Sequence, residues 1–515
     1  MTYKQNSRGD NNYTSSINKS LEANIRYIKE EIGESKDLVI REFNLNKNSS
    51  IRFALIYIEG LVDKNFIQDF LLEIANSIIN QNSSISSKRN LLDHLISFPL
   101  FAGKTEEIYE FESLILKILS GFTLIMQEGY ERSIAINTSY IEGRQVEKPT
   151  TEPAIRGSKE GFIENIDINT SLIRKRIKDK NLRIETYSIG RTTKTDINMM
   201  YIKGIVDEKI VKEVRIRLER IDIDGIIDSG NIEELIQDDT YTPFPTVFST
   251  ERPDTVVAGL LEGRVAIIVN GSPFVLIVPA LFIQFFQANE DYHNYFFTSS
   301  LIRILRYFSY FLTMLVPAFY IAMTTFHQEM IPTPLLISIA AQREGVPFPV
   351  FIEIIIMEVA FEIIRESSLR MPRAVGSTIS IVGVLVIGQA AVEAGIISAF
   401  VVIIVSLTAI SSFTTPNNSM ALSARILRFV FIILATTFGL YGIAMGLIAL
   451  ILHLCSLRSF GVPYTSPLSP FIGDEMKDSI FRFPIWSMIF RPRDISKKNL
   501  RRQGKDAPHK PRKKQ

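Results

Sequence analysis

The run Ser377-Thr-Ile-Ser-Ile-Val-Gly-Val-Leu-Val-Ile-Gly-Gln-Ala-Ala-Val-Glu-Ala-Gly-Ile-Ile-Ser398 is followed without a polar break by Ala399-Phe-Val-Val-Ile-Ile-Val-Ser-Leu-Thr-Ala-Ile-Ser-Ser412. Both runs lie inside an apolar block that extends from residue 301 to residue 457. About 20 mainly apolar residues are enough for one helix to cross a bilayer, and a soluble core of ordinary size does not require such runs one after another. The sequence therefore predicts a membrane-embedded half and a second half attached to it.

Composition differs between the two halves of the 515-residue chain. Residues before about 250 are rich in Asn, Lys, Glu and Ile, whereas residues 300–457 are nearly empty of Lys and Asp. The single cysteine, Cys455, excludes a disulfide within the chain and agrees with a cytoplasmic setting for the soluble half. The first ten residues lack the apolar region of a cleaved signal peptide, so membrane insertion is expected to depend on the internal spans.

A seven-residue motif occurs twice in the soluble half. Tyr57-Ile-Glu-Gly-Leu-Val-Asp63 and Tyr201-Ile-Lys-Gly-Ile-Val-Asp207 each follow a strand-like run and precede a segment with helical periodicity. The glycine suits a sharp turn, and the aspartate suits a helix N-cap because its carboxylate can accept hydrogen bonds from first-turn amides. The repeat predicts either two related α/β subdomains, with a ligand cleft between them, or a strand–turn–helix unit used twice for packing.

Shorter patterns predict individual elements around this repeat. Leu21, Ile25, Ile28 and Ile32 recur at helical spacing, and residues 121–136 are typical of strands. The turn pair Asn270-Gly271 lies between two β-branched runs in residues 265–278, which indicates a hairpin. The short apolar piece at residues 279–286 is expected at the membrane surface. A basic cluster (Arg174, Lys175, Arg176, Lys178, Lys180 and Arg183) favours a solvated helix face, or contact with anionic lipid or a partner, over nucleic-acid binding.

Five apolar runs are predicted to cross the membrane. The last is about 31 residues long, so a break at Gly439 and Gly442 would divide it into two short spans. Six crossings are preferred, with four as the alternative. Residues 331–341 contain two prolines and are too short to span, which suggests a re-entrant segment. The predicted runs are 302–326, 348–366, 377–396, 397–413 and 426–456.

The distribution of Lys and Arg predicts the orientation. From Arg491 onward the chain holds eleven Lys and Arg residues against two aspartates, so the C-terminus is expected in the cytoplasm. An even number of crossings then places the large N-terminal half in the cytoplasm as well. The tail after residue 490 is expected to be disordered and able to adhere to anionic lipid headgroups.

Several polar side chains fall inside the predicted spans. A charge at the bilayer centre costs several kcal/mol unless it faces a partner or water. Glu358 with Glu362, and Gln389 with Glu393, are each four residues apart and therefore share a helix face. These faces are predicted either to line a hydrophilic ion path or to pair between helices. The candidate pore-lining or intramembrane polar residues are Gln389, Glu393, Glu353, Glu358 and Glu362, and Gly383 and Gly388 are candidates for close helix packing.

No catalytic, cofactor or metal signature is present. The five histidines are scattered, without the spacing of a metal site, and no nucleophile elbow, phosphate loop or dinucleotide fingerprint occurs. The sequence therefore predicts a protein that is not an enzyme and that needs no cofactor.

Four motifs in the membrane half resemble one known family. They are Phe326-His-Gln-Glu-Met-Ile-Pro-Thr-Pro334, Arg343-Glu-Gly-Val-Pro-Phe-Pro349, Met357-Glu-Val-Ala-Phe-Glu362 and Ile381-Val-Gly-Val-Leu-Val-Ile-Gly-Gln-Ala-Ala-Val392. The chain resembles, from about residue 38 to 490, the A subunit of the GerA family of spore germination nutrient receptors. The resemblance implies a receptor in the spore inner membrane, made with a transporter-like B subunit that binds the nutrient and a lipoprotein C subunit. It also implies that A subunits oligomerise into an ion-conducting pore.

Residue patterns and resemblance together predict an α+β protein. An N-terminal cytoplasmic module of two related α/β subdomains is followed by a polytopic α-helical membrane domain and a disordered basic tail. The expected function is that of a germinant-receptor subunit that forms a nutrient-gated ion-conducting oligomer; a structural scaffold or a secondary transporter is the alternative. The expected segments are a polar tail with a short helix at 1–35, subdomains at 36–145 and 146–250, a juxtamembrane hairpin and interfacial segment at 251–300, the membrane domain at 301–457, a post-membrane segment at 458–490 and the tail at 491–515.

Overall fold

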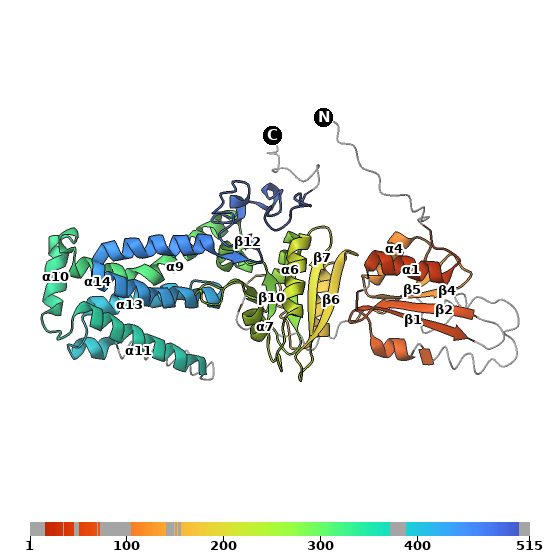
Figure 1. Ribbon diagram of the computed structural model, residues 1–515, viewed down its shortest axis with the longest axis horizontal. Helices are drawn as coiled ribbons and strands as arrows, with labels where there is room; N and C mark the ends of the chain where they lie inside the picture. The colour runs from red at the N-terminus through yellow and green to blue at the C-terminus, as the bar shows by residue number, and fades with distance from the viewer. Residues whose placement is uncertain are drawn as a thin grey trace, which may run out of the picture.

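The computed structural model describes residues 16–33, 35–45, 51–69, 71–72, 105–140, 149, 152, 156–370 and 388–503. Two β-sheets and a bundle of long helices follow one another along the longest axis of the molecule (Figure 1). The N-terminal sheet lies at one end, the second sheet lies in the middle, and the helical bundle forms the other end.

The first sheet is antiparallel and has the strand order β1-β2-β4-β5-β3. The predicted helix forms as α1 (Leu21–Ile32), capped by the Ser20 hydroxyl, and buries the four apolar residues of its periodic face. It packs beside α4 (Phe111–Ile118) on one face of the sheet. The predicted strands in residues 121–136 are confirmed. The strands are β1 (Leu38–Leu45), β2 (Ile51–Ile58), β3 (Thr105–Ile108), β4 (Phe122–Gln127) and β5 (Ser133–Asn137).

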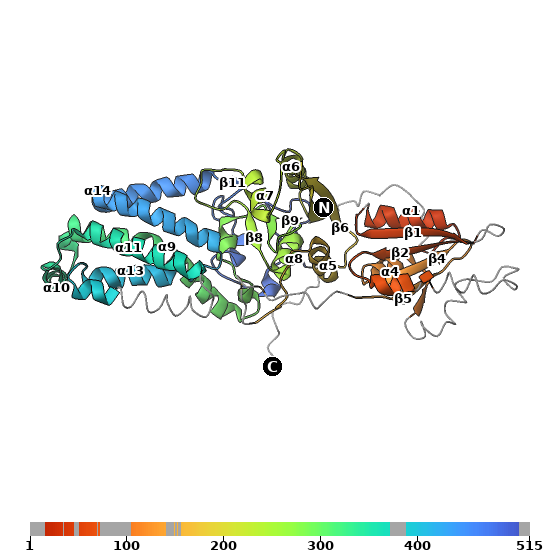
Figure 2. The ribbon, with the colours of Figure 1, turned by 90° about the horizontal axis from the view of Figure 1, so that it is seen from below.

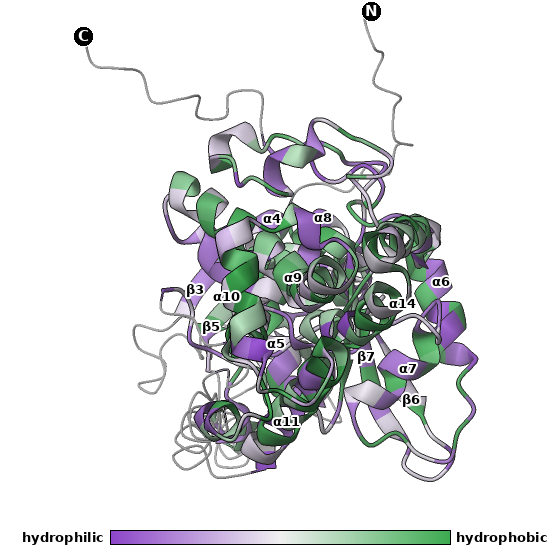
Figure 3. Cartoon of the chain, turned by 90° about the vertical axis from the view of Figure 1, so that its left-hand side faces the viewer, coloured by the Kyte–Doolittle hydropathy of each residue, from purple (hydrophilic) through white to green (hydrophobic). Residues whose placement is uncertain are grey.

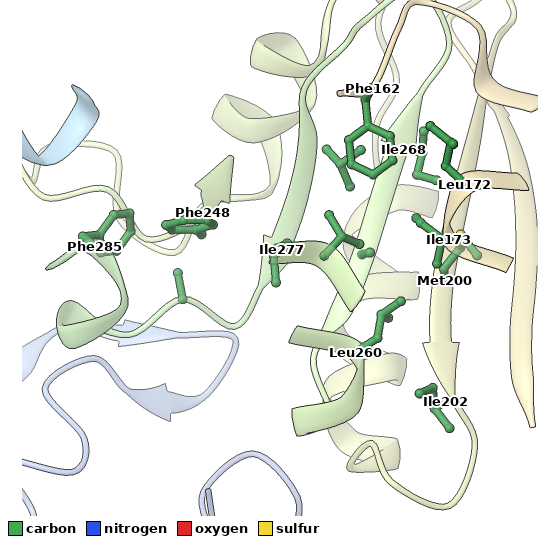
Figure 4. Close-up of a cluster of buried hydrophobic side chains, with 14 of the residues drawn as sticks. Phe162, Leu172, Ile173, Met200, Ile202, Phe248, Leu260, Ile268, Ile277 and Phe285 are labelled. Carbon is green, nitrogen blue, oxygen red and sulfur yellow. The ribbon is translucent and has the colours of Figure 1, made fainter. Parts of the chain in front are cut away.

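The second sheet repeats this arrangement in the order β6-β7-β9-β10-β8. Alternate side chains of its strands point to opposite faces, so Met200 and Ile268 pack under α5 (Ile166–Arg176) and α8 (Pro253–Glu262), as Figure 4 shows. Their neighbours Met199 and Ile267 pack under helices on the opposite face. Those helices are α6 (Glu208–Glu219) and α7 (Ser229–Ile236), and the strands are β6 (Leu182–Ile189), β7 (Thr195–Ile202), β8 (Phe248–Thr250), β9 (Val265–Val269) and β10 (Val275–Val278).

The duplicated motif occupies the same place in both sheets. It begins at the end of β2 and again at the end of β7, and Gly60 and Gly204 turn the chain with φ of 85° and 89°. The Asp63 carboxylate accepts a hydrogen bond from the Asn65 amide at 2.9 Å, and Asp207 accepts one from the Lys209 amide at 3.1 Å. Identical strand order together with identical turn and cap chemistry supports two related subdomains. The ligand cleft between them stays a prediction.

The boundary drawn at residue 250 was wrong. The hairpin in residues 265–278 forms, with Gly271 at φ 89°, but it supplies the strands β9 and β10 of the second sheet. The segment expected at the membrane surface is the short 3-10 helix η2 (Phe282–Phe286), whose five side chains are buried. Its three phenylalanines belong to one core with residues of the second sheet and with Tyr310 of the bundle. Strands β9 and β10 are covered on both faces and are therefore apolar throughout, so residues 265–278 looked like part of the approach to the membrane.

The prediction of a solvated basic face was wrong for Arg174. Its side chain is fully buried, and its Nε lies 2.9 Å from an Asp37 carboxylate oxygen of the first subdomain. It also donates to the Ser35 hydroxyl at 3.2 Å and to the Leu182 carbonyl at 3.1 Å. Lys180 pairs with Glu31 beside it. The cluster therefore joins the two subdomains.

Replacing Arg174 with Met should destabilise the chain strongly, because Asp37 would remain buried without its counter-charge. Breaking such a pair costs roughly 3 kcal/mol or more, which corresponds to a fall of about 3 °C or more in the midpoint of thermal unfolding of the purified chain. Lys175→Met, at the exposed neighbouring position, is the matched control. Equal midpoints for the two variants would contradict the role assigned to the buried pair.

The helical bundle begins with α9 (Phe296–Thr325), which starts beside the second sheet and runs away from it (Figure 1). At the remote end lies α10 (Thr333–Arg343), which occupies the predicted re-entrant segment. The chain continues with α11 (Val350–Arg370), α13 (Ala399–Ser412) and α14 (Asn418–Ser456). Of the predicted crossing at 377–396, only residues 388–396 belong to the described part, and they are helical as far as Glu393.

The predicted break in the last apolar run is confirmed. Gly439 has φ 61° and ψ −141°, outside the helical range, in the middle of α14. A Cβ atom on Gly442 would lie 2.3 Å from the Leu434 carbonyl oxygen, and one on Gly446 would lie 2.8 Å from Phe431. Such approaches require the second half of α14 to fold back along the first, as Figure 2 shows. Glycines allow this close contact because they lack a side chain. The total of six crossings stays a prediction.

Substituting Gly439 with Ala should weaken the bundle by about 1–3 kcal/mol, because residues with a Cβ rarely adopt this backbone conformation. A Cβ there would also meet Phe326 at 3.0 Å. The thermal unfolding midpoint of the purified chain measures the effect. Gly345→Ala serves as control, since its added methyl group would meet open space. An unchanged midpoint for Gly439→Ala would rule out the strain.

The bundle exposes an extensive apolar surface. Two helices, α9 and α14, are long and apolar enough to cross a membrane, and α13 is a shorter apolar helix. Only 17% of the most apolar part of α14 is buried, whereas the core helix of a soluble protein would be mostly covered. Figure 3, viewed from the helical end, shows hydrophobic residues spread over these helices. A surface of this kind marks a membrane or a partner interface.

The tail was predicted to be disordered from residue 491, but residues 491–503 are docked on the second subdomain. Arg491 is largely buried and its Nε donates to the Leu261 carbonyl at 2.8 Å. Lys497 lies 2.9 Å from Asp207, the helix cap of the second motif. Basic residues therefore find carboxylate and carbonyl partners on the protein itself, which composition alone could not indicate. Residues 504–515 lie outside the described residues.

Candidate functional site

Two of the predicted intramembrane acids lie in buried contacts between helices. Glu353 is fully buried, and its carboxylate accepts hydrogen bonds from the Ser398 amide at 2.8 Å and the Ser398 hydroxyl at 2.7 Å. Arg343 approaches the same carboxylate at 3.4 Å. Glu353 therefore ties the start of α11 to the end of α10 and to the residue that precedes α13.

Glu358 makes the second contact, one helical turn and a half further along α11. It pairs with Arg428 of α14, and both side chains have no solvent exposure. The Thr408 hydroxyl lies 3.5 Å from the Glu358 carboxylate. Glu362 faces the same helix and pairs with Arg425 at 2.9 Å. These pairs hold α11 against the first half of α14. They agree with the second predicted alternative, in which the polar residues pair between helices, and both partners belong to one chain.

Gln389 and Glu393 have a different environment. The Gln389 amide donates to the Glu393 carboxylate at 2.8 Å, which confirms that the two residues share a helix face, and both are exposed. Gly388 is buried on the other side, where an added Cβ would lie 3.3 Å from Val402 of α13. Among the predicted polar residues, this pair is therefore the one left open to water or to another chain. Gly383 lies outside the described residues.

A buried ion network at the base of α9 was not predicted. Asp291 lies 3.1 Å from Arg303 and 2.8 Å from Arg306, and Arg303 also lies 2.9 Å from Asp478 in the C-terminal segment. Burial raises the pKa of the Asp478 carboxyl, and the Arg303 guanidinium only partly offsets this effect. The spacing of Arg303 and Arg306, three residues apart near the start of a predicted span, was a signal for a common partner.

Within the described residues, no three His, Cys, Asp or Glu side chains gather to form a candidate metal site. The polar side chains described above form ion pairs and hydrogen bonds within the chain. Their chemistry suits holding helices together and, at the exposed Gln389–Glu393 face, contacting water, ions or another chain.

Comparison with known proteins decides the family. Residues 26–494 match the family model described as the Bacillus/Clostridium GerA spore germination protein. The chain belongs to the GerA family. The family assignment covers both sheets and the helical bundle, so the resemblance noted in the sequence is confirmed.

Two relatives and one solved structure illustrate the range of this GerA chain's similarity. Spore germination protein KA of Bacillus subtilis (strain 168) is 50% identical over 491 residues, covering 95% of this chain and 89% of that protein. Spore germination protein GerLA of Bacillus cereus is 41% identical over 92% of this chain and 95% of its own length. The solved structure is the crystal structure of the N-terminal domain of the A subunit of the Bacillus megaterium spore germinant receptor GerK3. Its sequence is 40% identical to this chain, and the superposition covers 53% of this chain and 100% of the GerK3 domain, with a TM-score of 0.42.

Arg428→Met in this GerA protein should be far more harmful than removal of the whole ion pair. The single change leaves Glu358 buried and unpaired, at a cost of roughly 3–5 kcal/mol, whereas Glu358→Gln/Arg428→Met removes both charges and should recover most of this loss. The melting temperature of the purified chain measures both effects. Arg370→Met, in an exposed pair with Glu366, should stay within about 0.5 kcal/mol. A double variant as unstable as the single one would refute the pairing argument.

Proposed function

We propose that this GerA chain is a membrane subunit of a nutrient germinant receptor that triggers spore germination. Family membership carries the proposal, since relatives with 50% and 41% identity are spore germination proteins. The subunit would act in a receptor with a transporter-like B subunit and a lipoprotein C subunit. The exposed apolar helices support placement in a membrane, which for such a receptor is the spore inner membrane.

Both ends of the bundle support the proposal that the N- and C-terminal regions lie on the same side of the membrane, which the distribution of Lys and Arg predicts to be the cytoplasm. α9 leaves the second sheet, and α14 returns to it, where His453 lies 2.9 Å from the Thr242 hydroxyl. The following Tyr464 carbonyl accepts a hydrogen bond from Phe282 of the second subdomain at 2.8 Å. If the bundle spans the bilayer, the two sheets and the C-terminal segment lie on one side of it, in agreement with an even number of crossings.

For the mechanism, we propose that copies of the chain assemble into a nutrient-gated ion-conducting pore. The exposed Gln389–Glu393 pair is the best candidate lining. Glu353, Glu358 and Glu362 are engaged in contacts inside the protomer, so in this arrangement they shape the bundle that presents the lining. The same internal pairs are the observation that favours the scaffold alternative, in which the helices only hold partner subunits in place.

Gln389→Leu/Glu393→Leu should reduce nutrient-evoked ion release from spores by about tenfold or more, because losing about 1.4 kcal/mol of ion stabilisation slows passage tenfold. Ion release from spores that carry the variant receptor at normal levels is the measurement. The control is Glu366→Leu/Arg370→Leu, which alters an exposed pair at the same spacing on α11. Unchanged ion release from an assembled Gln389/Glu393 variant would refute the assignment of this pair to the pore lining and favour the scaffold function.

A further inference from the structure

Five charged side chains meet where α11, the end of α13 and the first half of α14 come together. Arg425 pairs with Glu362 and Arg428 pairs with Glu358. Arg365 adds a third cation: its guanidinium lies 5.5 Å from the centre of the Phe413 ring and within electrostatic range of both other arginines. Three arginines and two glutamates leave the cluster with one uncompensated positive charge.

The hydrogen-bond donors of this cluster also exceed its acceptors. Arg365 Nη1, Arg425 Nε and both Nε and Nη2 of Arg428 are buried without a hydrogen-bond partner among the described residues. One acceptor, Glu362 Oε1, is in the same state; it lies 4.0 Å from Arg428 Nη2, beyond hydrogen-bond distance. Buried polar groups are normally paired. Arg428 is compensated by Glu358, and the surplus charge falls on Arg365, which is partly exposed. Four unpartnered donors and one net positive charge make the cluster suited to an anion.

The position of the cluster identifies the kind of anion. On α14, Ala424 belongs to the core shared with the second sheet, and Phe431 belongs to the core of the bundle. Arg425 and Arg428 lie between them. On the same helix the Ser423 hydroxyl donates to the Pro243 carbonyl of the α/β part. The cluster therefore lies at the level where the bundle emerges from its α/β cap, which is headgroup depth if the bundle spans a bilayer.

We propose that Arg365, Arg425 and Arg428 bind the phosphate of an anionic phospholipid at this level. A phosphodiester carries one negative charge, which matches the excess of the cluster, and its oxygens suit the forked donors of arginine. Glu362 is the competing acceptor, whose carboxylate repels the bound anion. The site is separate from the Gln389–Glu393 face and does not require that the protein conduct ions.

The test is titration of the purified full-length chain in a neutral detergent with short-chain phosphatidylglycerol, followed by native mass spectrometry. Arg365→Gln should weaken binding about tenfold, since a hydrogen bond to a charged group contributes about 1.5 kcal/mol or more. Glu362→Gln, which removes the competing carboxylate without a change of shape, should strengthen it. Arg370→Gln, on the same helix in an exposed pair, is the matched control and should bind like the unaltered chain.

Two further arms separate the sources of phosphate. Phosphatidylcholine, whose choline group neutralises its phosphate, should bind more weakly than phosphatidylglycerol. Inorganic phosphate that displaces phosphatidylglycerol and binds equally well alone would keep the anion site but overturn its assignment to lipid. Equal binding by Arg365→Gln and Arg370→Gln, or weaker binding by Glu362→Gln, would overturn the site. Because no nutrient or ion gradient is present, the result is independent of the pore proposal.

Discussion

The arrangement of the bundle depends on buried ion pairs, because a charge among apolar helices is stable only beside a charge of opposite sign. Glu358 and Arg428 are both completely buried and in contact, and separating them would leave either ion in a medium where isolation costs several kcal/mol. The pair therefore fixes how α11 lies against α14. Glu353 does the same in the first turn of α11 through Ser398. Apolar packing alone is non-directional, whereas these contacts specify one arrangement of the helices.

Comparable buried pairs lie at the other junctions of the chain. Arg174 and Asp37 join the first subdomain to the second, and Asp291 with Arg303 and Asp478 joins the base of α9 to the C-terminal segment. Breaking any of these pairs would cost free energy, so we expect the paired residues to stay in contact if the subdomains and the bundle move.

The sequence predicted the elements better than their environments. Helical periodicity located α1, the Asn-Gly turn located the β9–β10 hairpin, and the glycines located the reversal in α14. These features follow from local chemistry. Environments depend on long-range contacts. Arg174 looked solvated because its partner Asp37 lies 137 residues away. Residues 279–286 looked interfacial because a short apolar segment buried in a core has the same composition as one at a membrane surface. Glu358 was recognised as needing a partner, but periodicity could not choose between Arg428, water and another subunit.

The environment of the exposed Gln389–Glu393 pair also depends on contacts that the sequence does not specify. Gln389 and Glu393 satisfy one another with a single hydrogen bond and leave their remaining donors and acceptors on the surface of the bundle. In lipid such a face would be costly, whereas against water or polar groups of another chain it would be stable. The helix that carries it has its glycine side packed on α13, so it cannot turn the polar face inward without losing that contact. A single copy of the chain therefore leaves this polar face open, and the proposed assembly of copies around it rests on this observation.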